Sequence, residues 1–359
     1  MKIIDTIETK WINSFKGIAI IGIVLVHFGI KSIDNKWFSF LVYYGAKGVY
    51  IFALVTAYLM YYSLDKNEVD NMKKAGTWLV SKIIRLIPLY YLAIVVYLIV
   101  EGTGNRWWLG SLPKISILNV VSHFLFLHGF NPYYCNSILG VEWYIGVLFM
   151  LYLIAPFLHK FVNNFRRSVM FFMVSLIVCN YYLKLSDFRV IADDYIWSYF
   201  VENFTLISLL PLVSLGIVLY YGINSVYFKQ IIGNKASSFF CIFFFLFIIY
   251  RLMRGSNFYG LSTAGFWGMA LSGIIISQVI FPNKLLCNSI FATLGKYSYG
   301  IFLFHYLLIN HVPEIPIKNV YFSWIVNYGI ILCLSLGVAV LLDKFIEKPI
   351  LNKCSIRRK

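Results

Sequence analysis

Charged residues are scarce in this chain of 359 amino acids, and acidic ones are the scarcest. Asp, Glu, Lys and Arg make up 13% of the sequence, with 15 acidic residues against 31 lysines and arginines. Soluble domains carry about 25% charged residues, so this composition argues against a soluble protein. The net charge of +16 then has a simpler explanation than nucleic-acid binding, because basic loops fix the orientation of membrane proteins.

Paired cysteines, a cleavable leader and internal repeats are also missing. The six cysteines are scattered without CxxC spacing, which predicts buried thiols rather than disulfides or metal ligands. Asp5 and Glu8 precede the first apolar run, and no small-residue cleavage site follows it, so we expect a retained first helix. The chain has no linker or low-complexity stretch. We therefore expect a single membrane domain over 1–359 with no appended soluble domain.

Long apolar runs are what the sequence has in abundance. Hydrophobic residues make up 60% of it and aromatic residues 19%. A run of about 20 apolar residues can cross a bilayer as a helix. Such runs occur at 14–31, 38–62, 83–101, 138–158, 168–184, 205–223, 237–254, 262–281, 290–311 and 322–342. The sequence therefore predicts an all-α integral membrane bundle of about ten transmembrane helices.

An eleventh apolar run, 117–130, is shorter and contains two histidines. With ten crossings and a cytoplasmic N-terminus, most basic residues lie inside, Arg166 and Arg167 among them, and Asp193 and Asp194 lie outside. An eleventh crossing would place the two arginines outside, against the positive-inside rule. We therefore predict that 117–130 is a short re-entrant or interfacial helix, and that both termini of this cell-membrane protein are cytoplasmic.

Lys16 and His27 stand eleven residues apart in the first apolar run, KGIAIIGIVLVHF. Eleven residues make about three helical turns, so the two side chains share one stripe, about 16 Å apart along the axis. A histidine at membrane depth is costly and marks a candidate functional site. The alternative is a lysine at the membrane surface and a histidine that bonds a neighbouring helix.

Two further ionisable residues fall within predicted spans. Glu142 is the one acidic residue well inside such a run, at a depth similar to His27, and is a candidate functional carboxylate. An ion pair with Lys47 or a protonated helix contact is the alternative. His305 falls well inside the run 290–311, where it faces the same cavity or bonds a tyrosine as a structural histidine.

His123 and His128 lie five residues apart in the eleventh run. That spacing is poor for a metal site, and no carboxylate is near in the sequence, so we expect no zinc and no other metal.

Lys82 and Arg85 are about one helical turn apart in SKIIRLIPLYY. Together with Lys16 they would form a cationic entrance at the cytoplasmic face, where a guanidinium suits phosphate recognition. The alternative is ordinary basic flanking of a membrane helix, which fits Lys82 better than Arg85.

The order of these patterns resembles the membrane acyltransferase-3 family, whose first span carries a basic residue, ten residues and a histidine. Further stretches resemble family signatures in the same order: GAKGVYIFALVTAYLM (45–60), SKIIRLIPLYY (81–91), GVEWY (140–144), LGKYSYGIFLFH (294–305) and IEKP (346–349). The resemblance covers nearly the whole chain. It departs from the family at Lys16, where arginine is usual. The usual tryptophan and serine before the glutamate are replaced in NSILGVE, and ALVTAY replaces the usual phenylalanine-rich, serine-glycine ending of the second span.

The resemblance implies an integral membrane O-acyltransferase. It would transfer an acetyl or other short acyl group from acyl-CoA, typically acetyl-CoA, to a hydroxyl of a bacterial cell-surface or capsular polysaccharide or its precursor. In this hypothesis Lys16, Lys82 and Arg85 bind the phosphates of coenzyme A. His27 is the general base or itself carries the acyl group, Glu142 orients it, and His305 completes the site. Neither a metal nor a nucleic acid takes part, and the oligomeric state is open.

The rival interpretation is a transporter or flippase of polysaccharide precursors, because intramembrane His, Glu and Lys also serve proton relays. The absence of an internal repeat and of paired broken helices in the sequence argues against it.

Overall fold

The computed structural model describes residues 2–29, 36–254 and 263–356, and their secondary structure is helical. The longer helices are α1 (Lys2–Gly29), α3 (Gly48–Lys66), α4 (Met72–Val100), α6 (Trp143–Phe161), α7 (Phe165–Leu183), α11 (Lys235–Met253), α12 (Thr263–Ile280) and α15 (Val320–Leu342). The shorter ones are α2 (Lys36–Gly45), α5 (Ile117–Phe124), α8 (Asp194–Asn203), α9 (Leu210–Ile223), α10 (Val226–Lys229), α13 (Ser289–Lys296), α14 (Ser298–His311) and α16 (Lys348–Ile356).

The predicted membrane bundle is confirmed. Within the described ranges, eight helical segments are long and apolar enough to cross a bilayer. Helices α9 and α14, each of 14 residues, fall on the two remaining predicted spans. Together these segments match the ten predicted runs.

The run 117–130 forms a short helix rather than a crossing, as predicted. Helix α5 has eight residues, about 12 Å at 1.5 Å per residue, which is too short to span a bilayer. One face buries Asn119 and His123, whereas Ile117 and Leu118 are 85% and 67% exposed. An amphipathic helix with an exposed apolar face is typical of an interfacial segment.

Two predicted spans are broken. The run 38–62 divides into α2 and α3, and the run 290–311 divides into α13 and α14 at Tyr297. Neither break contains a proline, so the apolar pattern alone gave no sign of it. At the second break the chain leaves α13, which packs on α1, and enters α14, which carries His305.

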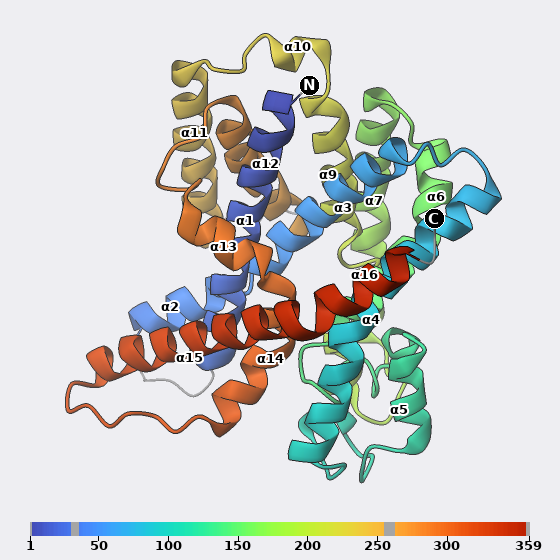
Figure 1. The fold of residues 1–359 in the computed structure, drawn as a ribbon, viewed down its shortest axis with the longest axis vertical. Coiled ribbons are helices and arrows are strands. Elements are labelled where there is room, and N and C mark those ends of the chain that lie inside the picture. Colours follow the sequence, from blue (N-terminus) through green and yellow to red (C-terminus); the bar gives the residue numbers. More distant parts are fainter. Residues whose placement is uncertain (1, 30–35, 255–262, 357–359) are drawn as a thin grey trace.

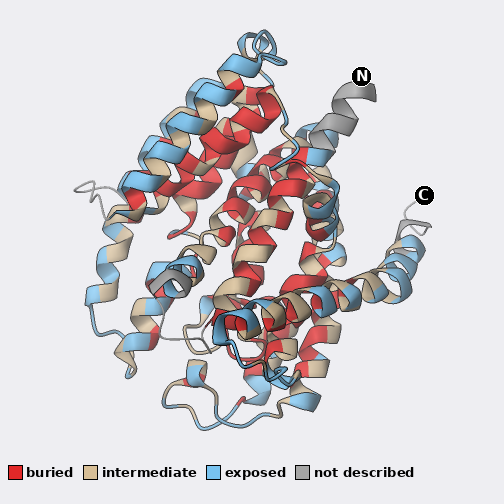
Figure 2. Cartoon of the chain, turned by 90° about the vertical axis from the view of Figure 1, so that its left-hand side faces the viewer, coloured by how far each residue is buried: buried red, intermediate tan, exposed pale blue. Residues whose placement is uncertain are grey.

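Helix α1 is central to the packing, in contact with α2, α3, α13, α14 and α15 (Figure 1). The buried residues gather where the helices face each other, and the exposed ones lie on the outer faces (Figure 2). The helix backbones approach closely where α13 crosses α1. A Cβ atom at Gly295 would lie only 1.7 Å from the Asn13 carbonyl oxygen, so this crossing requires glycine.

Three cysteines, Cys135, Cys179 and Cys287, have buried side chains, as predicted. Cys241 is partly exposed and Cys333 is exposed on α15. The side chain of Cys354 lies outside the described residues.

Candidate active site

Helix α1 carries Lys16 near its middle and His27 close to its last residue, so both lie on one continuous helix, as predicted. Both side chains are half-buried. Lys16 and His27 therefore mark the two ends of one stretch of α1, separated by about three helical turns.

His27 is hydrogen-bonded to His305. The Nδ1 atom of His27 lies 2.8 Å from Nε2 of His305, and the ring centroids are 5.0 Å apart. His305 belongs to α14 and is fully buried. The two histidines are 278 positions apart in the chain, and the contact of α1 with α14 brings them together.

The backbone of α14 determines which nitrogen of His305 carries a hydrogen. His305 Nδ1 lies 3.0 Å from the Ile301 carbonyl oxygen and 2.8 Å from that of Phe302. A carbonyl oxygen only accepts, so Nδ1 of His305 must donate, and in the neutral ring Nε2 is an acceptor. His27 Nδ1 then donates to His305 Nε2. A neutral His27 is left with its lone pair on Nε2.

Tyr306 and Gly140 form the next layer around His27. The Tyr306 ring meets the His27 ring edge-on, at 5.6 Å between centroids and an interplanar angle of 83°. On its other side Tyr306 packs on Gly140, where a Cβ atom would lie 3.1 Å from the ring. Gly140 has a φ of +80°, a conformation that a residue with a side chain rarely adopts. The glycine of GVEWY thus lets a loop lie against the histidine pair.

Glu142 is not inside a helix, contrary to prediction. Helix α6 begins at Trp143, and Glu142 precedes it at the end of the loop that contains Gly140. Its fully buried carboxylate accepts the backbone N–H groups of Ile138 at 2.6 Å and Val141 at 3.0 Å. These bonds to the loop's own backbone explain why the apolar run 138–142 is not helical.

The predicted pairing of Glu142 with His27 is also not observed. The Glu142 carboxylate lies 3.2 Å from Nε2 of His123 on α5, and this histidine is fully buried. His123 Nδ1 donates to the Asn119 carbonyl oxygen at 2.9 Å. A single proton is therefore shared between His123 Nε2 and Glu142. Whichever of the two holds it, the pair is neutral overall, which removes the cost of a lone buried carboxylate.

Two side chains that were not predicted as site residues, Arg106 and His128, support the loop that precedes α6. Arg106 donates to the carbonyl oxygen of Ile138 and, at 2.9 Å, to that of Gly102. His128 stacks on His123 with 4.4 Å between ring centroids. The chain segment before α6 is thus fixed on three sides, by Arg106, by the His123–Glu142 pair and by Tyr306.

The three predicted phosphate-binding residues lie in one electrostatic cluster. Lys16, Lys82 and Glu347 each interact with the charge of Arg85, and Glu347 interacts with Lys16 as well. Arg85 is exposed and the two lysines are half-buried. Glu347 ends a π-helical turn, Asp343–Glu347. A π-turn inside a long helix is frequent at functional sites. This turn ends on the first two residues of the IEKP stretch, Ile346 and Glu347.

Lys47, the alternative partner of Glu142, is engaged elsewhere. Its Nζ lies 3.4 Å from the Tyr50 hydroxyl, 4.6 Å from the Tyr50 ring centroid and 5.7 Å from the Trp267 ring centroid. The lysine is thus held among aromatic rings, a cation–π arrangement. His305 likewise bonds a histidine and the backbone rather than a tyrosine.

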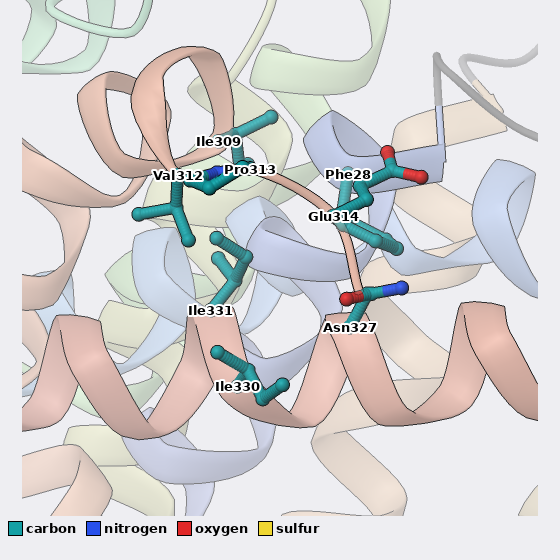
Figure 3. Close-up of a pocket in the computed structure, with 8 residues that line it drawn as sticks. All are labelled: Phe28, Ile309, Val312, Pro313, Glu314, Asn327, Ile330 and Ile331. Carbon is teal, nitrogen blue, oxygen red and sulfur yellow. The ribbon is translucent and has the colours of Figure 1, made fainter. Parts of the chain in front are cut away.

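A small cavity, with room for about one water molecule, lies next to the far end of α1 (Figure 3). Phe28, the neighbour of His27, lines it together with the end of α14 and with Asn327 and Ile331 of α15. Neither His27 nor His305 lines this cavity, so it adjoins the helix ends beyond the histidine pair rather than the pair itself. Among the described residues, no group of three or more His, Cys, Asp or Glu side chains is arranged to hold a metal ion.

Comparison with known proteins matches the model of the acyltransferase-3 family, described as "Acyltransferase domain", to residues 9–344. The chain belongs to the acyltransferase-3 family. It is also 25% identical over 268 residues to "Putative acetyltransferase ORF330" of Acidianus two-tailed virus, covering 74% of this chain and 73% of that protein. No solved structure matches the chain.

Family membership favours the membrane acyltransferase over the transporter. The signatures of this acyltransferase occupy connected places in its structure. Lys16 and the IEKP turn meet in the charged cluster, whereas His27 meets His305, the last residue of LGKYSYGIFLFH. GVEWY forms the loop against Tyr306.

Proposed function

We propose that this membrane acyltransferase transfers an acetyl or other short acyl group from acyl-CoA to a hydroxyl of a cell-surface or capsular polysaccharide, or of its precursor. The observation that carries the proposal is the 2.8 Å hydrogen bond between His27 and His305, which leaves the lone pair of His27 Nε2 for a proton. A base held in one orientation by a second group is the usual arrangement for activating a hydroxyl.

The reaction needs one proton to leave the acceptor and one to reach the leaving group. His27 Nε2 takes the hydroxyl proton while the acceptor oxygen bonds to the thioester carbonyl carbon. The C–S bond then breaks, and the thiolate of coenzyme A takes the proton from His27. His305 Nε2 accepts from His27 Nδ1 throughout and stabilises the imidazolium without a charge of its own. In a variant of this scheme, His27 Nε2 carries the acyl group between donor and acceptor.

The charged cluster suits the donor. Coenzyme A is polyanionic, and Lys16, Lys82 and Arg85 offer cations to its phosphates. We place this cluster at the cytoplasmic face of the cell membrane, where the excess of basic residues is expected and where acyl-CoA is found. Lys16 and His27 are about 16 Å apart along α1, a separation that the extended pantetheine arm would bridge.

Glu347 is the acidic member of the cluster, and we assign it the task of holding the cations in place before the donor binds. It interacts with both Lys16 and Arg85. Without a counter-charge, the like charges of Lys16 and Arg85 would repel each other.

The test uses the full chain in lipid nanodiscs with acetyl-CoA labelled in the acetyl group. The acceptor is polysaccharide from host cells that lack the gene, and the readouts are label in the polysaccharide and its ester groups by NMR. We expect wild type and His311→Ala, a control at an exposed histidine of α14, to transfer label, and His27→Ala to transfer none while remaining folded. Wild-type activity in folded His27→Ala would exclude His27 as the base. If the wild-type protein moved label to no hydroxyl of the polysaccharide, the proposed acyl transfer would be excluded.

A further inference from the structure

Tyr97 of α4 is inserted into the hydrogen-bond ladder of α14. Its side chain is fully buried at 1% exposure. Its hydroxyl donates to the Leu303 carbonyl oxygen at 3.1 Å and accepts the Leu307 N–H at 2.9 Å. In an uninterrupted α-helix the N–H of residue 307 donates to the carbonyl of residue 303. The hydroxyl of Tyr97 therefore bridges the two partners of a helical bond.

This bridge spans the turn that carries His305, because residues 303 and 307 flank it two positions away on each side. His305 Nδ1 in turn donates to the carbonyls of Ile301 and Phe302, which directly precede this turn. A side chain that inserts into the i to i−4 ladder bends a helix locally. The direction in which His305 leaves α14 thus depends on the Tyr97 hydroxyl.

We propose that Tyr97 is a positioning residue, whose hydroxyl holds the α14 turn in the form that aims His305 Nε2 at His27 Nδ1. The proposal rests on the proposed function, in which that hydrogen bond orients the base. Tyr97 itself touches neither the acyl donor nor the acceptor in this scheme.

The hydroxyl, rather than the ring, is the part that matters. A buried hydroxyl is costly unless it is bonded, and here both its donor and its acceptor capacity are used within one turn of another helix. Tyrosines of membrane proteins commonly anchor a helix at the interface, with the hydroxyl in water. Tyr97 does not, because it is buried in the bundle. Phenylalanine would fill the same volume and leave the Leu303 and Leu307 groups to bond each other directly.

Tyr91 provides a matched control on the same helix. It is a tyrosine of α4 whose hydroxyl donates to the backbone carbonyl of Phe124, the last residue of α5. Tyr91→Phe and Tyr97→Phe therefore each remove one hydroxyl that bonds the backbone, and only the second removes a contact with α14.

The experiment compares the two variants as full-length protein in nanodiscs. We expect Tyr97→Phe to lower kcat about 10- to 100-fold, because a small misplacement of a catalytic group costs that much, with an unchanged KM for acetyl-CoA. Tyr91→Phe should keep both constants. Adding Tyr97→Phe to His305→Phe should lower kcat no further, because Tyr97 acts through His305. Full kcat in Tyr97→Phe, or an equal loss in the His305→Phe background, would overturn the proposal.

A second readout does not depend on activity. With 15N-labelled histidine, the coupling across the hydrogen bond from His27 Nδ1 to His305 Nε2 is measured by NMR. It should be present in wild type and Tyr91→Phe and lost in Tyr97→Phe. A coupling that persists in Tyr97→Phe refutes the positioning role, even if wild type transfers acetyl groups. If the coupling is lost in Tyr97→Phe alone, the positioning role of Tyr97 is supported, even if no hydroxyl acceptor takes the label and the proposed function fails.

Discussion

His27 and His305 share one hydrogen bond, and its direction is set by the helix backbone rather than by a charged partner. Because His305 Nδ1 donates to carbonyls of its own helix, its Nε2 can only accept from His27. In the proposed mechanism the orienting group is thus a neutral imidazole, where a carboxylate was expected. A neutral partner would avoid burying a second charge beside the imidazolium that the proposed reaction forms.

Replacing His305 with phenylalanine should keep an aromatic ring at this position and remove the His305 Nε2 acceptor for His27 Nδ1. We expect kcat to fall about 10²-fold, the lower end of what a well-placed base supplies, and KM for acetyl-CoA to stay the same. Steady-state kinetics on nanodisc-embedded protein measure both. His311→Phe, at an exposed histidine of the same helix, is the control. Unchanged kcat in His305→Phe would show that His27 needs no orienting partner.

Glu142→Gln should destabilise the protein almost as much as Glu142→Ala. The two carboxylate oxygens face the Ile138 and Val141 N–H groups, so either orientation of an amide points its NH2 group at a backbone donor. One unsatisfied buried group costs about 1–3 kcal/mol, measured as a lower midpoint of thermal unfolding in detergent. Glu101→Gln, at a partly exposed carboxylate, is the control. A Glu142→Gln protein of wild-type stability but without activity would instead indicate a direct chemical role.

Lys16→Ala should weaken donor binding more than it slows the reaction. A lost charge-assisted hydrogen bond is worth about 1.5–3 kcal/mol, so KM for acetyl-CoA should rise about 10- to 100-fold. Lys16→Arg should bind at least as well as wild type, because a guanidinium matches phosphate geometry. Lys229→Ala removes an exposed lysine of α10 and should change neither constant. If Lys16→Ala left the affinity for coenzyme A unchanged, the proposed phosphate site would be wrong.

Asp193 joins two loops in a pH-dependent way. Its carboxylate accepts the Ser111 N–H at 2.9 Å and the Ser111 hydroxyl at 2.7 Å. The backbone hydrogen bond first, and the hydroxyl second, hold the pKa of Asp193 below its usual range. A lowered pKa stabilises the fold above the unfolded pKa of about 3.9, and this stabilisation is lost as the pH falls through the folded pKa.

Acid should therefore release the contact between the segment at Ser111 and the start of α8. Hydrogen exchange of these two segments, corrected for intrinsic rates, should speed up in wild type as the pH falls from about 6 to about 3. This range includes the reference pKa of aspartate, about 3.9. In Asp193→Asn exchange should already be fast at pH 6, and Asp187→Asn should behave as wild type. Equal protection of wild type and Asp193→Asn at pH 6 would contradict this assignment.

The apolar runs were enough to predict the membrane bundle, because a length of about 20 residues and the scarcity of charge decide whether a segment crosses. The Lys16–His27 register was predictable for a similar reason, since helical periodicity is local. The breaks after Gly45 and at Tyr297 were not predictable, because they depend on contacts between helices. The helix start at Trp143 was missed because a buried carboxylate, not a proline, holds the preceding loop.

The partners within the site required the structure. His27 and His305 are 278 positions apart, and no local pattern encodes that pairing. His123 was set aside because its spacing from His128 does not suit a metal, yet a buried Glu142 demands a partner. The eleventh run offered two histidines, His123 and His128, at 19 and 14 positions from Glu142. Tyr97 gave no signal, because a tyrosine in an apolar run is typical of any membrane helix.

The crossing of α13 with α1 should be the position least tolerant of added volume. Gly295→Ala would place its Cβ 1.7 Å from the Asn13 carbonyl oxygen, which belongs to backbone and cannot rotate away. Overpacking costs about 1–3 kcal/mol and occasionally more, and we expect the upper end here, read as a lower unfolding midpoint. Gly329→Ala on α15 meets no atom within 4 Å and should be neutral or slightly stabilising, because alanine is the better helix former. Since α13 leads into the helix of His305, Gly295→Ala should also weaken the His27–His305 coupling in NMR. Wild-type stability in Gly295→Ala would mean that α13 does not pack on α1 at this distance.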